Sequence, residues 1–567
     1  MPASVFGAEI TVNEEITNAQ TQPQVILLAD GRFLFVWYST DLDVDGTSLG
    51  GVAARVGTLQ PDGSMVWAAA GEFTVNVNTQ NAQETPQATL LSDGRVLITY
   101  SSNAVATDGN GYGVAARIGS IQADGSIVWA AAGEFTVNEE VTSNQYDQQV
   151  TLLKDGRVLI TFTSQDGDVD GDSLAIAARV GTVQMNGSIA WASPNEITVN
   201  LEGQGLQQQP QVTVLGDGRV LFVWTTSDTT IDPDIGIAAR VGEVQADGSI
   251  TWAVAGEFRV NEGGALYQTG AQVAVLQDGR VVFAWANDAN GGISARVGSI
   301  QADGSITWAT GDITVHQENA GSQFEPQLIV LADGRVLFTW RSNDPDVDGS
   351  GYGVAARIGD VQADGTIVWQ SEGEINLNQE VTNDQINAQA LALADGRVLV
   401  VWSSLDTDVD GNGYGIAGRL MLFNAPTDAQ DDSFDISETG AIADADLFAD
   451  NGSGVDTEGD GEAFTVTAAN GSALNVGTPF VSGLGATVTL QSNGTFGYDP
   501  NGAFSLRFGQ SVVDTLTYRI DDGFGGTSTA TVSITINSAG ESFVGTGDVD
   551  DFAGTAYGDL ITGDVRG

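Results

Sequence analysis

The chain contains no cysteine, one histidine and one lysine, and each of these scarcities excludes a kind of site. Without cysteine there can be no disulfide and no thiolate metal site, so zinc, which prefers sulfur and imidazole ligands, is not expected. The sequence also lacks a run of 18 apolar residues and an amino-terminal segment typical of a signal peptide. Membrane insertion is therefore not expected.

Positive charge is scarce as well, since 20 Lys and Arg stand against 74 Asp and Glu and give a net charge of −54. Such a surface repels phosphate backbones and anionic lipid headgroups, so nucleic acid is not an expected partner. Its self-repulsion is screened by salt, which suits a saline extracellular setting. An apolar fraction of 42% and 73 Gly among 567 residues indicate a folded, turn-rich, all-β protein.

A repeat of about 62 residues dominates the first three quarters of the chain. Each of seven copies has an Asp-Gly-Arg turn, an apolar strand, a small-residue strand that ends in Arg, and a strand typified by Glu-Phe-Thr-Val-Asn. Two-residue turns and alternating apolar residues predict four short strands in each copy. The Asp-Gly-Arg turns begin at Asp30, Asp93, Asp155, Asp217, Asp278, Asp333 and Asp395.

The strand count predicts how the repeat closes. The last copy stops near residue 422 without its fourth strand, whereas an extra copy of that strand lies at residues 4–13. Pairing of the two would close a ring and remove the exposed edges of an open array. We therefore expect residues 1–422 to form a seven-bladed β-propeller closed by the amino-terminal strand, with a β-solenoid as the alternative.

Four of the loops between the second and third strands carry Asp at alternate positions followed by Gly. Calcium takes six to eight oxygen ligands, and this spacing brings three carboxylates to one tight turn. A solvated acidic hairpin is the alternative, because the bidentate Glu of an EF-hand loop is absent. The predicted calcium ligands are Asp41, Asp43, Asp45, Asp166, Asp168, Asp170, Asp344, Asp346, Asp348, Asp406, Asp408 and Asp410.

A glutamine stands six residues before each Asp-Gly-Arg turn, where the innermost strand of each blade begins. A ring of amides could bind a polar ligand such as a sugar, or could satisfy backbone groups where neighbouring blades meet. The ligand-binding candidates are Gln24, Gln87, Gln149, Gln211, Gln272, Gln327 and Gln389. We interpret the 14 repeated Arg as ties between blades.

The repeat ends near Asn424, and residues 423–538 have short alternating strands that predict a β-sandwich. Here the motifs Asn493-Gly494-Thr495-Phe496 and Asp521-Asp522-Gly523 resemble those of the cadherin-like domains of secreted bacterial adhesins. The resemblance implies calcium near the interdomain linker. Its possible ligands are Asp431, Asp432 and Glu438.

Residues 539–567 have a nine-residue period in which Asp550 and Asp559 fall in register. The period resembles the nonapeptide of repeats-in-toxin proteins, although the Gly at its second and fourth places is missing. The resemblance implies the start of a parallel β-roll in which these two Asp bind calcium. With the calcium-binding repeats of large secreted bacterial proteins, which residues 1–422 resemble, it implies type I secretion.

Two functions follow as expectations. The first is a non-enzymatic, secreted, calcium-binding adhesin or matrix protein whose loop face recognises an extracellular polysaccharide or surface protein, as a monomeric head on a larger chain. The alternative is a secreted glycoside hydrolase or other hydrolase with a catalytic propeller. The 74 acidic residues could include a catalytic pair, but no pair is singled out by spacing.

Overall fold

The computed structural model of the protein describes residues 4–14, 18–41, 49–60, 63–79, 81–104, 111–139, 143–165, 174–193, 195–201, 205–262, 267–288, 291–317, 321–345, 347, 351–370, 373–379, 383–406, 409, 413–422, 427–458, 463–522, 526–545 and 553–563. The chain divides into two compact units, residues 2–422 and residues 423–567. Within the described ranges, no helix is long and apolar enough to cross a membrane.

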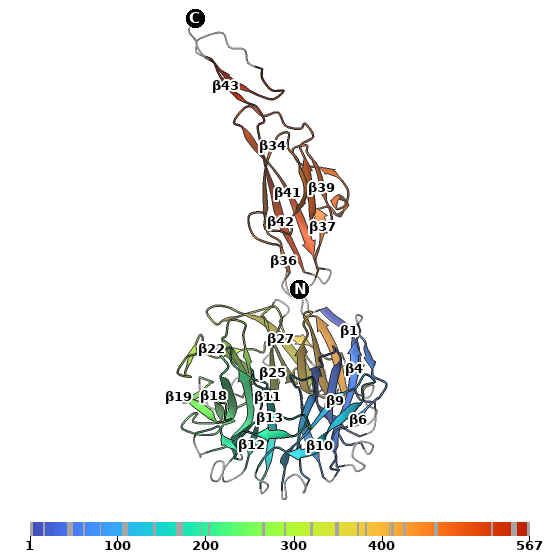
Figure 1. Cartoon of the computed structure of the whole chain (residues 1–567), viewed down its shortest axis with the longest axis vertical. Coiled ribbons are helices and arrows are strands. Elements are labelled where there is room, and N and C mark those ends of the chain that lie inside the picture. The colour runs from blue at the N-terminus through green and yellow to red at the C-terminus, as the bar shows by residue number, and fades with distance from the viewer. Residues whose placement is uncertain are drawn as a thin grey trace. The chain divides into compact units, whose positions relative to one another are not determined.

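The larger unit consists of four- and five-stranded antiparallel sheets of one repeated design (Figure 1). The first strands are β2 (Gln20–Leu27), β7 (Gln83–Leu90), β11 (Gln145–Leu152), β16 (Gln207–Val214), β20 (Gln268–Val275), β25 (Gln323–Val330) and β30 (Gln385–Ala392). The second strands are β3 (Phe33–Ser39), β8 (Val96–Ser102), β12 (Val158–Ser164), β17 (Val220–Thr226), β21 (Val281–Asn287), β26 (Val336–Ser342) and β31 (Arg397–Ser404). The third strands are β4 (Gly51–Leu59), β9 (Gly113–Ile121), β13 (Ala175–Val183), β18 (Gly236–Val244), β22 (Gly292–Ile300), β27 (Gly353–Val361) and β32 (Gly415–Leu422).

The outer strand is continuous in three sheets and divided into two pieces in the others. The continuous strands are β1 (Ser4–Thr11), β10 (Ile127–Thr136) and β19 (Ile250–Arg259). The divided strands are β5 (Met65–Trp67) with β6 (Phe73–Thr74), β14 (Ile189–Trp191) with β15 (Ile197–Thr198), β23 (Ile306–Trp308) with β24 (Ile313–Thr314), and β28 (Ile367–Trp369) with β29 (Ile375–Asn376).

The amino-terminal strand completes the last sheet, in the order β1-β32-β31-β30. β1 pairs antiparallel with β32, from Ser4 opposite Leu422 to Thr11 opposite Ala417. The first strands of successive sheets contact one another, and β30 contacts β2 in the same way. The carboxylate of Glu9 also accepts the backbone N–H of Gln379. The two ends of this unit are thereby joined.

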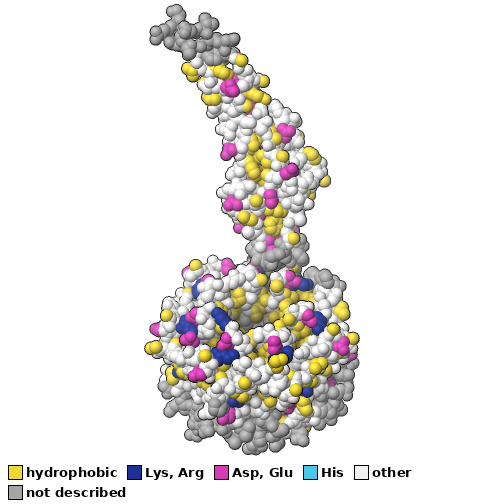
Figure 2. Space-filling model, viewed as in Figure 1, with side chains coloured by type: hydrophobic (Ala, Val, Ile, Leu, Met, Phe, Trp, Pro, Cys, Tyr) yellow, Lys and Arg dark blue, Asp and Glu magenta, His cyan; other side chains and the backbone are white. Residues whose placement is uncertain are grey.

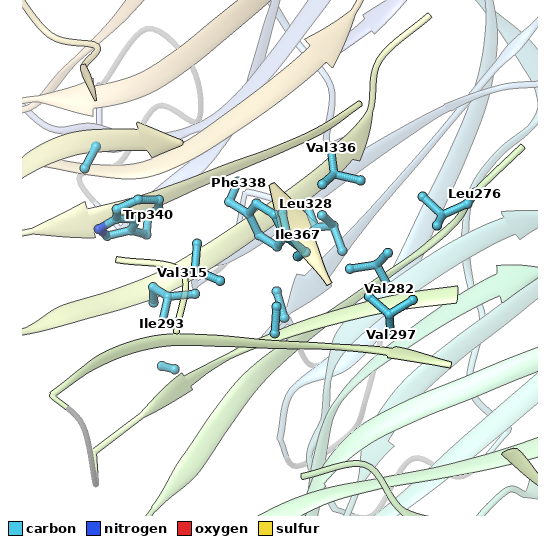
Figure 3. Packing of buried hydrophobic residues seen from close by; sticks show 14 of the residues in the cluster. Leu276, Val282, Ile293, Val297, Val315, Leu328, Val336, Phe338, Trp340 and Ile367 are labelled. Carbon is cyan, nitrogen blue, oxygen red and sulfur yellow. The ribbon is translucent and has the colours of Figure 1, made fainter. Parts of the chain in front are cut away.

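The core lies between neighbouring sheets, because the second strands are buried along almost their whole length. In the cluster of Figure 3, Phe338 and Trp340 from β26 pack with Val282 from β21 and Val297 from β22. Each third-strand Arg donates to a backbone carbonyl of the preceding sheet, as Arg117 Nη1 does to Val75 at 2.6 Å. Within its own sheet, the Arg117 guanidinium stacks 4.0 Å from the Trp129 ring centre. The third-strand Arg, seven of the 14 repeated Arg, therefore connect neighbouring sheets as predicted.

The smaller unit contains two four-stranded sheets over a shared apolar core that includes Leu490, Tyr498, Tyr518 and Ile534. One sheet has the order β34-β42-β41-β37 and the other has the order β35-β40-β39-β38. The elements are β33 (Thr427–Asp428), β34 (Asp432–Ser437), β35 (Ile442–Asp446), β36 (Thr457–Glu458), β37 (Thr465–Ala469), the 3₁₀ turn η1 (Ala473–Asn475), β38 (Phe480–Val481), β39 (Thr487–Leu490), β40 (Thr495–Asp499), β41 (Ser511–Asp521), β42 (Thr527–Asn537), β43 (Ser542–Val544) and β44 (Leu560–Thr562). β43 and β44 pair in parallel.

Candidate active site in the central cavity

Every first strand contains a β-bulge near its start. In β2 the pairing with β3 shifts register between Thr21 and Gln24, and each of the other first strands has the same shift. The third residue of each strand has a positive φ: Gln22 (56°), Thr85 (49°), Asp147 (54°), Gln209 (56°), Gly270 (65°), Glu325 (53°) and Asn387 (55°). A side chain other than glycine in this region costs about 1–3 kcal/mol, and such strain clusters at functional sites. We call these seven residues the bulge residues.

The bulge residues of five strands surround a cavity of about 220 Å³. This volume is far above the roughly 10–15 Å³ that a single water molecule needs. The lining is formed by the third to fifth residues of these strands, which include Asp147, Gln209, Gly270 and Glu325. Figure 2 labels none of these residues; it shows a hollow in one face of the unit, with Lys or Arg and Asp or Glu side chains on its rim.

Asp147 is the acidic bulge residue of β11. Its side chain is only half-buried because it faces the cavity, yet the surrounding protein atoms raise the pKa of its carboxyl by burial. The Thr163 hydroxyl, 3.3 Å from Oδ2, and the backbone N–H of Gln209 favour the charged form and partly offset that rise. Asp147 therefore keeps its proton to a higher pH than an ordinary aspartate.

Glu325, the acidic bulge residue of β25, has a different environment. Arg341 on β26 donates from Nη1 to Oε1 at 3.1 Å, and the backbone N–H of Asn387 donates to Oε2 at 3.3 Å. The guanidinium of Arg341 also stacks 3.8 Å from the ring centre of Tyr352. Bonds of this kind are short and directional, so they hold the side chain of Glu325 in place.

Five of the seven predicted ligand-binding glutamines line the cavity, namely Gln87, Gln149, Gln211, Gln272 and Gln327, which we call the cavity amides. All seven predicted glutamines are half-buried, and Gln24 and Gln389 do not line the cavity. Among the hydrogen bonds of the described residues, none involves the side-chain amides of the seven. The cavity amides can therefore donate to and accept from a bound molecule.

A second ring of glutamines has a structural role. These residues start the first strands and are almost fully buried: Gln20, Gln83, Gln145, Gln207, Gln268, Gln323 and Gln385. In the second copy, Asn76 Nδ2 donates to Gln83 Oε1 at 2.9 Å, and Asn76 Oδ1 accepts the Val52 N–H of the preceding sheet. His316 takes the place of this Asn in one copy, where Nδ1 accepts the Ile293 N–H at 2.9 Å.

The predicted calcium loops lie mostly outside the described residues. Asp43, Asp45, Asp166, Asp168, Asp170, Asp346, Asp348, Asp408 and Asp410 belong to that part of the chain. Asp41, Asp344 and Asp406 are described and buried. Asp41 accepts a hydrogen bond from the amide of Gln20, and Asp406 accepts one from that of Gln385 at 2.8 Å. One carboxylate oxygen in each of these two loops is thus already bonded to the protein.

The predicted ligands in the smaller unit make separate contacts. Asp431 accepts the Thr531 N–H at 2.7 Å, and Glu438 accepts the N–H groups of Leu506 and Ala539. Asp432 is buried, and this burial raises its pKa to about 6, helped by the charges of Asp456 and Asp431. Within the described ranges, no three Asp, Glu or His side chains converge to hold a metal ion.

In the carboxy-terminal segment, Asp550 lies outside the described residues, whereas Asp559 is described. Asp559 Oδ1 accepts the Glu541 N–H at 2.8 Å and the Thr555 hydroxyl at 2.6 Å. It therefore connects β44 to the chain before β43.

The bulge residues and Arg341 were missed in the sequence. Two constant glutamines, at the first and fifth places of each first strand, flank the bulge position, and that position itself varies from copy to copy. Variation inside an otherwise constant strand was the available signal. Arg341 was a second signal in the sequence. Its position, the one before Ser342, holds a small hydroxyl residue in four other copies, namely Ser101, Thr163, Thr225 and Ser403.

Residues 424–538 match the bacterial cadherin-like domain, which confirms that part of the predicted resemblance. The match does not extend to residues 539–567, and the similar structures described below do not support the repeats-in-toxin resemblance. No curated protein matches the chain.

Several solved structures are similar to the chain in fold. A protein of unknown function from Dyadobacter fermentans is 15% identical, with a TM-score of 0.43, over 74% of this chain and 100% of that one. The GH93 α-L-arabinofuranosidase of Fusarium graminearum, in complex with arabinobiose, is 12% identical, with a TM-score of 0.41, over 59% and 92%. The α-L-arabinanase of Penicillium chrysogenum, with arabinobiose, is 14% identical, with a TM-score of 0.40, over 60% and 93%.

These neighbours correct two expectations, the adhesin function and the absence of enzymatic activity. Structures similar to this chain are described as glycoside hydrolases, so neither expectation is kept. At identities of 12–14% and TM-scores of 0.40–0.41, the neighbours' own activities and substrates do not carry over to this chain. The function is therefore argued from the cavity.

Proposed function

We propose that residues 2–422 form a seven-bladed β-propeller that hydrolyses glycosidic bonds of an extracellular polysaccharide in its central cavity. The pairing of β1 with β32 and the contact of β30 with β2 support a closed ring of blades. Blade interiors supply a rigid frame on which the cavity residues are held.

The observation that carries the proposal is the presence of two carboxyl groups in unlike environments within one cavity. Burial raises the pKa of Asp147, whereas Arg341 is ion-paired with Glu325. Two carboxyl groups that are held in different environments can take different roles, one as acid and one as carboxylate. We assign the acid role to Asp147 and the carboxylate role to Glu325.

The chemistry follows from these roles. Asp147 gives its proton to the glycosidic oxygen as the bond between that oxygen and the anomeric carbon breaks. The Glu325 carboxylate either attacks the anomeric carbon or takes a proton from an attacking water, and one water is consumed overall. Retention of the anomeric configuration would identify Glu325 as the nucleophile, and inversion would identify it as the base, as read by ¹H NMR of the first product.

The test is the release of reducing sugar from a polysaccharide panel by the full chain and by Asp147→Asn and Glu325→Gln. A positioned acid or base contributes about 10²- to 10⁴-fold, so each variant is expected to lose activity by that factor. Glu243→Gln makes the same change of charge at an exposed strand position and should retain wild-type activity. Full activity of Asp147→Asn and Glu325→Gln would refute the proposal.

Secretion, calcium binding by the alternating Asp loops and a carboxy-terminal β-roll are further proposals about this chain. The parallel pairing of β43 and β44, with partners 18 residues apart such as Ser542 and Leu560, supports the β-roll. This offset of 18 residues equals two nine-residue periods of the sequence.

A further inference from the structure

The cavity contains no positive charge of its own. Among the described residues that line it there is no Lys, Arg or His, and the two acidic side chains are those of Asp147 and Glu325. An anionic sugar such as a uronate would enter this cavity without a counter-charge. Moving an unpaired charge out of water is costly, and the Glu325 carboxylate nearby adds repulsion.

The cation that contacts a cavity carboxylate, Arg341, is already engaged. Arg341 does not line the cavity, and its Nη1 is bonded to Glu325 at 3.1 Å. Its guanidinium lies 3.8 Å from the Tyr352 ring centre, so two neighbours fix its position. Turning Arg341 toward an anionic ligand would break the ion pair with Glu325 and leave that carboxylate without its cation.

The cavity amides supply the opposite kind of group. Each amide has two N–H donors and a carbonyl acceptor, which match the hydroxyl groups of a sugar ring. Five of them come from five successive first strands, β7, β11, β16, β20 and β25, so they surround the cavity. Neutral donors and acceptors recognise neutral polyols without any need for charge compensation.

We infer that the substrate of the cavity is an uncharged glycan bound through the cavity amides, and that glycans built of uronic acid or sulfated sugars are excluded. This inference rests on the proposed function and names the class of its substrate. The exclusion is local to the cavity and does not depend on the overall charge of −54.

The test compares hydrolysis by the full chain of neutral polymers (β-glucan, mannan, galactan, arabinan and dextran) with that of polygalacturonate, alginate and chitosan. Each assay is run in dilute buffer and in 1 M salt, where the screening length falls to about 3 Å and long-range repulsion is removed. We expect cleavage of at least one neutral polymer and no cleavage of the uronates or of chitosan at either salt concentration.

The alternative outcomes separate the two claims. Cleavage of a uronate polymer, or of chitosan alone, would overturn the inference and leave hydrolase activity intact. Cleavage of none of the polymers would overturn the proposed function itself.

A second measurement tests the amides directly. Gln272→Met removes one cavity amide at similar side-chain size, and loss of one neutral hydrogen bond should raise KM about two- to tenfold. Gln277→Met is the matched control, because Gln277 follows the same strand, is exposed and donates to the Ala332 carbonyl outside the cavity. Equal KM values for the wild type and Gln272→Met would contradict amide recognition, and the unfolding midpoint of each variant shows whether folding is intact.

Discussion

The contact between Asp147 and Thr163 should affect the pH range in which the proposed enzyme is active. The Thr163 hydroxyl donates to its carboxylate and so favours the ionised form, against the rise in pKa caused by burial. Thr163→Val removes this bond at nearly constant volume, so the pKa of Asp147 should rise further. Since the acid must be protonated to act, the alkaline limb of the kcat/KM profile should move to higher pH.

Thr225→Val is the matched control, because Thr225 makes the corresponding bond to an amide, Gln209, at 3.3 Å. Its alkaline limb should coincide with that of the wild type. A limb that stays in place or moves to lower pH in Thr163→Val would show that Asp147 is not the acid.

At the residue scale the sequence predicted the neighbourhood of the site and missed its chemistry. The glutamines six residues before each Asp-Gly-Arg turn were found because they are constant, and five of the seven line the cavity. Asp147 and Glu325 lie two residues before Gln149 and Gln327, yet Asp and Glu each occur at this position in only one of the seven copies. A repeat reveals what all copies share, whereas the proposed catalytic pair departs from the repeat and is hidden among 74 acidic residues.

At the scale of elements, the tight turns on the outer hairpins pack against the preceding sheet. Gly248 has a φ of +82°, and a Cβ there would overlap the Cβ of Ala192 in the neighbouring sheet. Gly94, with a φ of +83°, occupies a similar turn but has nothing within 4 Å of such a Cβ. Both glycines adopt a positive φ, but only Gly248 packs against a neighbouring sheet.

Alanine at each position separates the two effects. Gly94→Ala should lower the free energy of unfolding by about 1–2 kcal/mol, the cost of the left-handed conformation alone. Gly248→Ala should cost about 1–3 kcal/mol more, because it overpacks the contact between blades. Urea unfolding followed by tryptophan fluorescence measures both, and equal losses would show that this contact can relax.

Strands and turns were well predicted because their signals are local. Asp-Gly turns and apolar runs of four to eight residues placed the second and third strands of each sheet. The bulge in the first strands was not predicted, because it is a slip in pairing between two strands. No residue type marks it, since Gln, Thr, Asp, Gly, Glu and Asn all occupy the position.

At the scale of the whole molecule, stability should depend on pH through the smaller unit. Asp432 has a folded pKa of about 6, above the ordinary 3.8, so the folded state favours its protonated form. This contribution to stability is complete below about pH 3.8 and is lost as the pH rises through about 6. Asp432→Asn should therefore raise the unfolding midpoint more at pH 7.5 than at pH 4.

Calorimetry of the full chain in chelator measures this difference. An equal rise in the unfolding midpoint of Asp432→Asn at pH 4 and pH 7.5 would contradict a buried, protonated Asp432.

We also expect the thermal stability of the full chain to depend on calcium. Thermal unfolding of the full chain in millimolar Ca²⁺ should occur at a higher midpoint than in chelator, since binding to the folded state stabilises it. The rise should exceed that with Mg²⁺ and should decrease when Asp408 and Asp410 are changed to Asn. Equal midpoints in Ca²⁺ and Mg²⁺ would leave the alternating Asp loops as solvated hairpins.

The central claim, two carboxyl groups with divided roles, is tested most directly by a substrate that needs no acid. A dinitrophenyl glycoside of the sugar released from the polysaccharide has a leaving group that departs without protonation. Asp147→Asn should lose about 10²- to 10⁴-fold on the polysaccharide but keep near wild-type kcat/KM for the aryl glycoside, since kcat/KM reports the steps up to the release of dinitrophenol. Glu325→Gln should lose activity on both, and wild-type rates for either variant on the polysaccharide would contradict the account.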